Sequence, residues 1–196
     1  ALMTEDDILN EFRDADALLS GHFLLSSGRH SAQYLQCARV LMDGDRAGRL
    51  ALALAQKLPR ELRSSVDVVI SPAMGGVIIG HEMGRALARP AMFVERPTGQ
   101  FELRRGFTIA PGSKVLLVED VVTTGLSSRE AIAAIAAEGG EVIAACSLVD
   151  RSGGTVDLGV PYTALIALNF PTYAAEELPP ELAATPAIKP GSRQAA

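Results

Sequence analysis

The chain has 196 residues, 48% of them hydrophobic, which suffices for the core of one good-sized domain and argues against global disorder. A formal net charge of −5 argues against a nucleic-acid partner, and two cysteines in unrelated contexts predict neither a disulfide framework nor a Cys-rich metal site. No apolar run approaches the roughly 18 residues of a membrane span, and no secretory leader is visible, so we expect a cytoplasmic protein without a membrane partner.

The N-terminal third of the chain predicts helices and short strands. Residues 4–19 predict a helix, because Thr4 is a suitable N-cap, acids fill the first turn and apolar residues recur at helical spacing. Short strands are expected at residues 22–25 and 31–36, and a strongly amphipathic helix at residues 45–62. Strands and helices do not alternate here, so these elements predict a small cap over one edge or end of a sheet.

From residue 66 onward, strands alternate with helices. The expected strands are residues 66–70, 91–94, 115–118, 142–149 and 162–168, and the expected helices are residues 77–88 and 128–138. This alternation is typical of an α/β fold with a doubly wound parallel sheet. We therefore expect a single domain over residues 1–196, with a hood largely from residues 1–65, a core over about 66–170 and an irregular Pro-rich tail from about residue 179.

The segment VLLVEDVVTTGLSSRE, residues 115–130, carries the strongest functional signal. Glu119 and Asp120 directly follow a buried-type strand, and the ligands of such sheets bind beyond the carboxyl ends of the strands. Residues 123–127 then lead into a helix, whose N-terminal amides favour an anion, and Gly125 permits close approach of the backbone. The segment therefore predicts a phosphate cradle beside two acids that bind hydroxyls, and hence a sugar phosphate ligand.

Ser127 and Glu130 also fit a simpler interpretation, a capping box at the start of the helix. In a capping box the serine side chain bonds a backbone amide of the first turn, and the glutamate reaches back to the N-cap amide. Both interpretations can hold together, but a capping box leaves the two adjacent acids unexplained. The other common phosphate motifs, G-x-G-x-x-G and Gly-Lys-Ser/Thr, do not occur in the sequence.

The segment VLLVEDVVTTGLS resembles the phosphoribosyl pyrophosphate (PRPP) motif of type I phosphoribosyltransferases. The segments FLLSSGRHSAQYL, SPAMGGVIIGHEMGRAL, FVERPTGQFELRRGF and SLVDRSGG resemble, in the same order, those of the orotate phosphoribosyltransferase family. The resemblance implies a five-stranded parallel sheet with an N-terminal hood, and transfer of ribose 5-phosphate from PRPP to orotate in UMP biosynthesis. It also implies Mg²⁺ that is held mainly by PRPP and pyrophosphate, without direct protein ligands.

The resemblance also implies roles for individual residues, with Glu119 and Asp120 holding the ribose hydroxyls at the catalytic centre. The residues expected to bind PRPP are Glu119, Asp120, Val121, Val122, Thr123, Thr124, Gly125, Leu126, Ser127, Gly75 and Gly76. Those expected to bind orotate are Thr123, Arg151, Tyr34 and Leu35. The simpler alternatives are a tight turn for the two glycines, a surface arginine at position 151, and ordinary hood packing for Tyr34 and Leu35.

The segment FVERPTGQFELRRGF predicts a hairpin, because two extended stretches flank the turn-forming Pro-Thr-Gly-Gln. Its arginines, Arg96, Arg104 and Arg105, could simply guard an exposed sheet edge. The resemblance implies instead that residues 95–107 form an arm, which closes over the active site of the neighbouring subunit in a homodimer. The three arginines would then act in catalysis by neutralising the departing pyrophosphate.

The sequence departs from one known pattern of the family. Residues 95–113 contain neither lysine nor histidine, and Ser26 and Gly75 stand where that pattern has lysines. The form ERxxGxxxLRRGF resembles another branch of the same family, so activity is still expected. No single arginine of the arm can be named as a general acid.

Two other functions fit the PRPP motif. A relative that uses adenine, hypoxanthine or xanthine would share it, and turnover of those bases without turnover of orotate would identify such an enzyme. A PRPP-sensing regulator would bind the ligand without catalysis, but such proteins usually carry an RNA-binding surface or a DNA-binding domain, which the acidic balance and the length do not favour. Association with a decarboxylase partner stays open.

Overall fold

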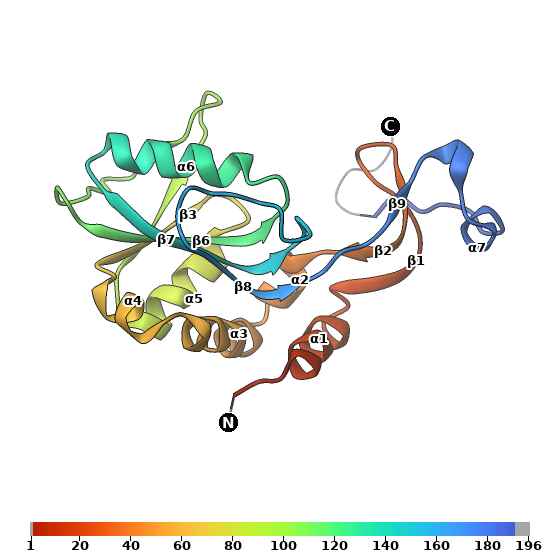
Figure 1. Cartoon of the computed structure of the whole chain (residues 1–196), viewed down its shortest axis with the longest axis horizontal. Coiled ribbons are helices and arrows are strands. Elements are labelled where there is room, and N and C mark those ends of the chain that lie inside the picture. The colour runs from red at the N-terminus through yellow and green to blue at the C-terminus, as the bar shows by residue number, and fades with distance from the viewer. Residues whose placement is uncertain (1, 191–196) are drawn as a thin grey trace.

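Residues 2–190 are described by a computed structural model, in which a twisted sheet carries helices on both faces (Figure 1). The strands of this sheet are β3 (Val68–Pro72), β4 (Ala91–Glu95), β5 (Glu102–Leu103), β6 (Lys114–Val122), β7 (Glu141–Asp150) and β8 (Tyr162–Ala167). Their order across the sheet is β5-β4-β3-β6-β7-β8. All except β5 pair in parallel, which confirms the predicted parallel sheet. We expected five strands, and over residues 2–190 the sheet has six, because the arm contributes β5 as an additional antiparallel edge strand.

The helices cover the two faces unequally. On one face lie α3 (Gly44–Lys57), α4 (Arg60–Ser65) and α5 (Val77–Leu87), and on the other lies α6 (Leu126–Ala137) (Figure 1). The single helix predicted over residues 45–62 is divided, because Pro59 cannot donate the backbone hydrogen bond of a continuous helix. Within residues 2–190, no helix is both long enough and apolar enough to cross a membrane.

Strand β6 is one of the two central strands, and its side chains alternate between two apolar clusters. Leu116 and Val118 pack into the cluster that contains α3 and α5. Val115 and Leu117 pack into the cluster that contains α6. Because side chains alternate along a strand, the two acids that follow are directed to opposite faces of the sheet.

The hood is a three-stranded antiparallel sheet at one end of the core (Figure 1). It consists of β1 (Leu18–Leu24), β2 (His30–Leu35) and β9 (Thr172–Tyr173), with α1 (Glu5–Asp14) before it and α2 (Cys37–Leu41) between β2 and α3. Helix α1 begins as predicted, with a capping box between Thr4 and Asp7. It ends at Asp14 and not at residue 19, because Asp16 adopts a left-handed φ of 53° and the residues from Leu18 onward pair in β1.

The C-terminal segment packs on the hood, where we expected an irregular tail. A short 3-10 helix, η1 (Ala175–Glu177), and α7 (Pro180–Ala183) follow β9. Beyond them, Ile188 exchanges backbone hydrogen bonds with β1, and the ring of His22 donates to the carbonyl of Thr185 over 2.8 Å. The hood is therefore built from both ends of the chain. Residues 191–196 of the expected tail lie outside the described residues.

Candidate active site

A pocket of about 370 Å³ opens at the carboxyl ends of β3 and β6. Its lining consists of Pro72, Ala73, Gly75, Gly76, Arg96, Phe101 and residues 119–128. The structure thus brings together every residue that the sequence predicts to bind PRPP. Two larger hollows, of about 560 and 500 Å³, lie beside α1 and α3 and are lined without glycine. The smaller pocket combines glycine-containing loops, a helix N-terminus and two adjacent acids, so we assign the chemistry to it.

Gly125 shapes the phosphate-binding part of this pocket. Its φ of 82° is left-handed, a conformation that L side chains rarely adopt. A β-carbon at this position would lie 2.5 Å from Cγ2 of Val156 and 2.8 Å from Cδ2 of Leu158. The bend at Gly125 therefore requires glycine, and it directs the chain into the first turn of α6.

The first turn of α6 supplies unpaired amides to the pocket. The amide of Leu126 donates to the hydroxyl of Thr124 over 3.3 Å. The amides of Ser127 and Ser128 have no protein acceptor within residues 2–190. The N-terminus of a helix also carries a partial positive charge. These groups can together receive the oxygens of one phosphate, as the sequence predicts.

The alternative interpretation, a capping box between Ser127 and Glu130, is wrong. The N-cap of α6 is Gly125, and no side chain caps this end of the helix. Instead Arg96 of the arm donates to Oγ of Ser127 over 3.1 Å and pairs with the carboxylate of Glu130 at 2.6 Å. A residue distant in sequence therefore takes both side chains that a capping box would use, and it lies at the rim of the pocket.

The two acids lie within β6 and not after it. We expected the strand to end at Val118, but backbone pairing with β7 continues to Val122. Glu119 is buried on the α6 side, where Oγ of Ser128 donates to its Oε2 over 2.9 Å. Asp120 is directed to the other face, and its Oδ1 accepts a hydrogen bond from the amide of Val121 over 2.8 Å.

Desolvation dominates the electrostatics of both acids. The pKa of Glu119 is raised to about 7, mainly by burial; the hydrogen bond from Ser128 and the charge of Arg96 oppose this rise, and the charge of Asp120 adds to it. Burial also raises the pKa of Asp120, against hydrogen bonds from backbone amides. Carboxyl groups with raised pKa values in a cleft are typical of functional sites.

The loop before α5 approaches Asp120 closely. A β-carbon on Gly75 would lie 2.8 Å from Oδ2 of Asp120, and one on Gly76 would lie 2.8 Å from the carbonyl oxygen of Pro72. Both glycines therefore do more than form a tight turn. The absence of a side chain at position 75, where one family pattern has lysine, leaves room for the carboxylate of Asp120.

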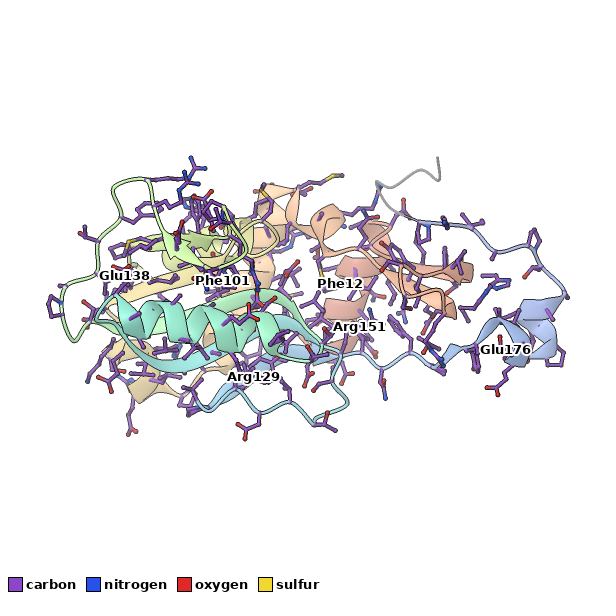
Figure 2. All side chains as sticks on the ribbon, turned by 90° about the horizontal axis from the view of Figure 1, so that it is seen from above. Phe12, Phe101, Arg129, Glu138, Arg151 and Glu176 are labelled. Atoms are coloured by element: carbon purple, nitrogen blue, oxygen red, sulfur yellow. The ribbon has the colours of Figure 1, made fainter. Side chains whose placement is uncertain are left out.

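Arg151 lies where the core meets the hood (Figure 2). Its amide donates to the carbonyl of Val122 over 2.8 Å, and its guanidinium lies 5.0 Å from the ring centroid of Phe170. The guanidinium is half-buried, and burial lowers the pKa of the side chain. Its Nε atom is buried and has no protein acceptor among the described residues. A buried unpaired donor favours an acceptor from a ligand over the alternative of an ordinary surface arginine.

The two hood residues predicted to bind orotate lie on β2, outside the pocket lined by the PRPP loop. Tyr34 stacks at 5.8 Å on Phe23, and it is near enough to Arg151 to oppose the lowering of the arginine pKa. Leu35 is partly buried against the large apolar cluster beneath the hood. Packing accounts for Leu35, whereas Tyr34 lies within electrostatic range of Arg151.

The arm forms the predicted hairpin from β4 and β5, but its three arginines have different surroundings. Arg96 stacks at 3.9 Å on the ring of Phe101 and lines the pocket of its own chain. Arg105 instead pairs with Glu95 over 2.8 Å, and Arg104 is exposed. The structure therefore brings only one of the three predicted arginines to this pocket.

Three residues near the start of α6 were not predicted from the sequence to belong to the site. Ser128 bonds Glu119, Glu130 pairs with Arg96, and Arg129 bonds two loop carbonyls. The helical spacing places their side chains around the helix, but their partners lie on other elements. Position in the sequence alone gives no signal for those contacts.

The chain matches the family model described as "Phosphoribosyl transferase domain" over residues 41–166. It is 76% identical to the orotate phosphoribosyltransferase of Sphingopyxis alaskensis, over 99% of this chain and 100% of that protein. It is 75% identical to the orotate phosphoribosyltransferase of Novosphingobium aromaticivorans, over 97% of this chain and 98% of that protein.

Solved structures show the same fold. The orotate phosphoribosyltransferase of Aeropyrum pernix superposes with a TM-score of 0.66 at 29% identity, over 82% of this chain and 93% of that one. The Mycobacterium tuberculosis orotate phosphoribosyltransferase in complex with PRPP superposes with a TM-score of 0.61 at 24% identity, over 82% of this chain and 95% of that one. At that identity the second match supports the fold alone.

Proposed function

This chain belongs to the orotate phosphoribosyltransferase family, and we propose that it uses the pocket at β3 and β6 to transfer ribose 5-phosphate from PRPP to orotate. The products are orotidine 5′-monophosphate and pyrophosphate, a step that we place in cytoplasmic de novo UMP synthesis. One observation carries the assignment of the pocket: the unpaired amides of α6, the buried Glu119 with the partly buried Asp120, and the glycines before α5 line the same hollow. A ribose with a phosphate at one end and a pyrophosphate at the other needs these three features.

The 5′-phosphate would bind at residues 123–127, in contact with the bend at Gly125 and the amides of Ser127 and Ser128. Those amides have no protein acceptor among the described residues. The hydroxyls of Thr123 and Thr124 are exposed and add further donors. Hydrogen bonds to a charged group contribute about 1.5–3 kcal/mol each. Several of them can therefore anchor the ribose while the bond at its C1 breaks.

Glu119 and Asp120 would bind the ribose hydroxyls as carboxylates. Breaking the bond at C1 places positive charge on the sugar, and a nearby carboxylate stabilises that charge. We assign the loop of Gly75 and Gly76 to the pyrophosphate of PRPP, and the carboxylate of Asp120 lies against Gly75. It is therefore suited to the region between the sugar and the leaving group.

Orotate would lie beside Thr123 and Arg151. Orotate is an anion with a carboxylate and ring carbonyls, and a guanidinium binds such groups with paired hydrogen bonds. Arg151 has a buried Nε without a protein acceptor among residues 2–190. Tyr34 would line the base from the hood side, and Leu35 would support it by packing.

Mg²⁺ fits this site as a companion of the substrate. The lining of the pocket contains two carboxylates, and within residues 2–190 no cluster of three or more His, Cys, Asp or Glu side chains is placed to hold a metal ion. A metal bound here would therefore take most of its oxygen ligands from PRPP and pyrophosphate. It would neutralise charge on the leaving pyrophosphate, and the acids would orient the ribose that carries it.

We also propose a homodimer in which the arm serves the neighbouring site. Arg104 and Arg105 lie outside the pocket of their own chain, so they need a second chain to reach a pyrophosphate. Four large apolar side chains are exposed on α2, α3, α5 and their adjoining loops, namely Met42, Leu52, Met74 and Ile78. Helices α3 and α5 pack side by side, and a second chain docked on them would cover these side chains.

A spectrophotometric assay tests the proposed reaction. Orotate absorbance should fall when the protein, PRPP and Mg²⁺ are combined, and pyrophosphate should appear in equal amount. Parallel reactions with adenine, hypoxanthine and xanthine should show no turnover. Turnover of a purine base without turnover of orotate would contradict the assignment, as would ligand binding without any reaction.

A further inference from the structure

Arg129 lies in the first turn of α6 and connects two loops at the pocket. Its Nη1 donates to the carbonyl oxygen of Thr124 and to that of Asp157, both over 3.2 Å. Thr124 belongs to the phosphate cradle, and Asp157 belongs to the loop between β7 and β8. In Figure 2, Arg129 and Phe101 of the arm lie on opposite sides of α6. The side chain is exposed and has no place in the sequence-based account of the site.

The bond to Thr124 orients the next amide. In a trans peptide the carbonyl and the following N–H point in opposite directions. When Arg129 holds the carbonyl of Thr124 away from the pocket, the N–H of Gly125 is directed toward it. The N–H of Gly125 has no protein acceptor among the described residues, and Gly125 lines the pocket. Arg129 thus fixes a donor that it does not itself touch.

The same bond keeps a second amide available. A helix beginning one residue earlier would have the amide of Ser128 donate to the carbonyl of Thr124. That hydrogen bond does not form within the described residues, and Arg129 donates to the carbonyl instead. The amide of Ser128 is therefore left for the phosphate.

The bond to Asp157 extends this effect to the loop that begins at Arg151. Within that loop, the hydroxyl of Thr155 donates to the carbonyl of Ser152, and the amide of Val156 donates to the hydroxyl of Ser152, so hydrogen bonds hold the segment together. Its residue Val156 also packs against the bend at Gly125. A displacement of Asp157 would therefore shift both the phosphate cradle and the segment that follows Arg151.

We propose that Arg129 is a positioning residue, which orients the amides of Gly125 and Ser128 toward the 5′-phosphate and ties the phosphate cradle to the Arg151 loop. This inference rests on the proposed function, because it assigns the phosphate of PRPP to the cradle. Arg129 itself would not contact the reacting atoms.

The test compares Arg129→Gln with Arg129→Lys and with the control Arg60→Gln. Arg60 is exposed at the start of α4, so the control removes the same charge away from the pocket. Arg129→Gln should raise the KM for PRPP about tenfold, the size expected for losing hydrogen bonds from a charged donor, with a smaller change in kcat. Arg129→Lys should recover part of the loss, because an ammonium can reach one of the two carbonyls. Arg60→Gln should match the wild type.

Calorimetric binding of ribose 5-phosphate provides a readout that does not depend on turnover. Arg129→Gln should weaken this binding by a similar factor, with Arg129→Lys in between. Equal binding by the wild type and both variants would overturn the proposal, as would losses that follow the melting temperature and are the same for Gln and Lys. If Arg129→Gln does not fold, the affinities of Arg129→Lys and the wild type for ribose 5-phosphate are compared. Weaker binding by Arg129→Lys supports the proposal, and equal binding overturns it. Failure of the wild type to convert orotate would count against the proposed function and leave this binding test standing.

Discussion

Glu119 and Asp120 are neighbours in the sequence, but their carboxyl groups lie on opposite faces of β6. Glu119 is fixed to α6 by the hydroxyl of Ser128, and Asp120 lies against Gly75 in the loop before α5. The separation follows from the alternation of side chains along a strand, which continues through the acids to Val122. The two acids therefore have different surroundings and are expected to have separable roles.

The pH dependence of PRPP use should reveal Glu119. Burial raises its pKa to about 7, and binding of the ribose hydroxyls needs the ionised form. The kcat/KM for PRPP should therefore rise with pH through about 7, because this ratio reports on groups of the free enzyme. The phosphate groups of PRPP also titrate near this pH. The pH profile of the wild type is therefore compared with that of Glu119→Gln, in which only the titration of the substrate remains. If kcat/KM rises near pH 7 in the same way in both proteins, the role of Glu119 is contradicted.

The same pKa has a consequence for the stability of the ligand-free protein. Its value in the folded state, about 7, exceeds the ordinary 4.5, so the folded state binds this proton more tightly than the unfolded chain. The contribution of Glu119 is fully present below pH 4.5 and is lost as pH rises through 7, by about 3 kcal/mol for a difference of this size. Urea unfolding across this range should show the loss, and Glu119→Gln should remove it. An unchanged pH dependence in the variant would refute the assignment.

The site was largely predictable where its residues are contiguous. The acids, the bend at Gly125 and the helix N-terminus follow one another in the chain, so local rules place them together. The end of β6 was not predictable, because Glu119 is held in the strand by pairing opposite Ser147 of β7. The capping box failed for a similar reason, since Arg96, from a distant hairpin, takes both of its side chains.

The hood shows the same limit at the level of the fold. The two N-terminal strands were expected from local pattern and turn residues, and both are present. The third strand, β9, and the contact of Ile188 with β1 join segments more than a hundred residues apart. The Pro-rich composition of the C-terminal segment predicts an irregular tail. The segment docks on the edges of the hood sheet, which exist only once the hood has folded.

Gly75→Ala should impair PRPP use without unfolding the protein. Its β-carbon would lie 2.8 Å from Oδ2 of Asp120, and this short side chain can turn away only by moving its carboxylate. We predict that kcat/KM for PRPP falls at least tenfold, while the melting temperature changes by no more than a few degrees. Gly44→Ala is the matched control, because a β-carbon there meets no atom within 4 Å. Wild-type kinetics in Gly75→Ala would show that the position of Asp120 is not critical.

Arg151→Lys should act on the base. Lysine keeps the charge but loses the planar fork that would pair with a carboxylate or carbonyl. The KM for orotate should rise about tenfold or more, with a smaller effect on the KM for PRPP. Steady-state kinetics with each substrate varied in turn measure the two effects. A change in the KM for PRPP without a change in the KM for orotate would contradict the assignment of Arg151 to orotate.

Subunit mixing tests the proposed role of the arm. Arg104→Ala should lower kcat, and Asp120→Asn should inactivate the pocket of its own chain. Random exchange of the two variants in a symmetric dimer would restore about a quarter of the wild-type sites, because each mixed dimer contains one intact combination. The control is a mixture of Asp120→Asn with Glu119→Gln, which both alter the same pocket and leave no intact combination. Absence of recovery after demonstrated subunit exchange would contradict action in trans.

A crystal structure with ribose 5-phosphate bound tests the central claim most directly. The account predicts the phosphate within about 2.7–3.2 Å of the amides of Gly125, Ser127 and Ser128, with the ribose hydroxyls at Glu119 and Asp120. A phosphate bound elsewhere on the chain, or a cradle that stays closed by protein side chains at saturating ligand, would contradict it.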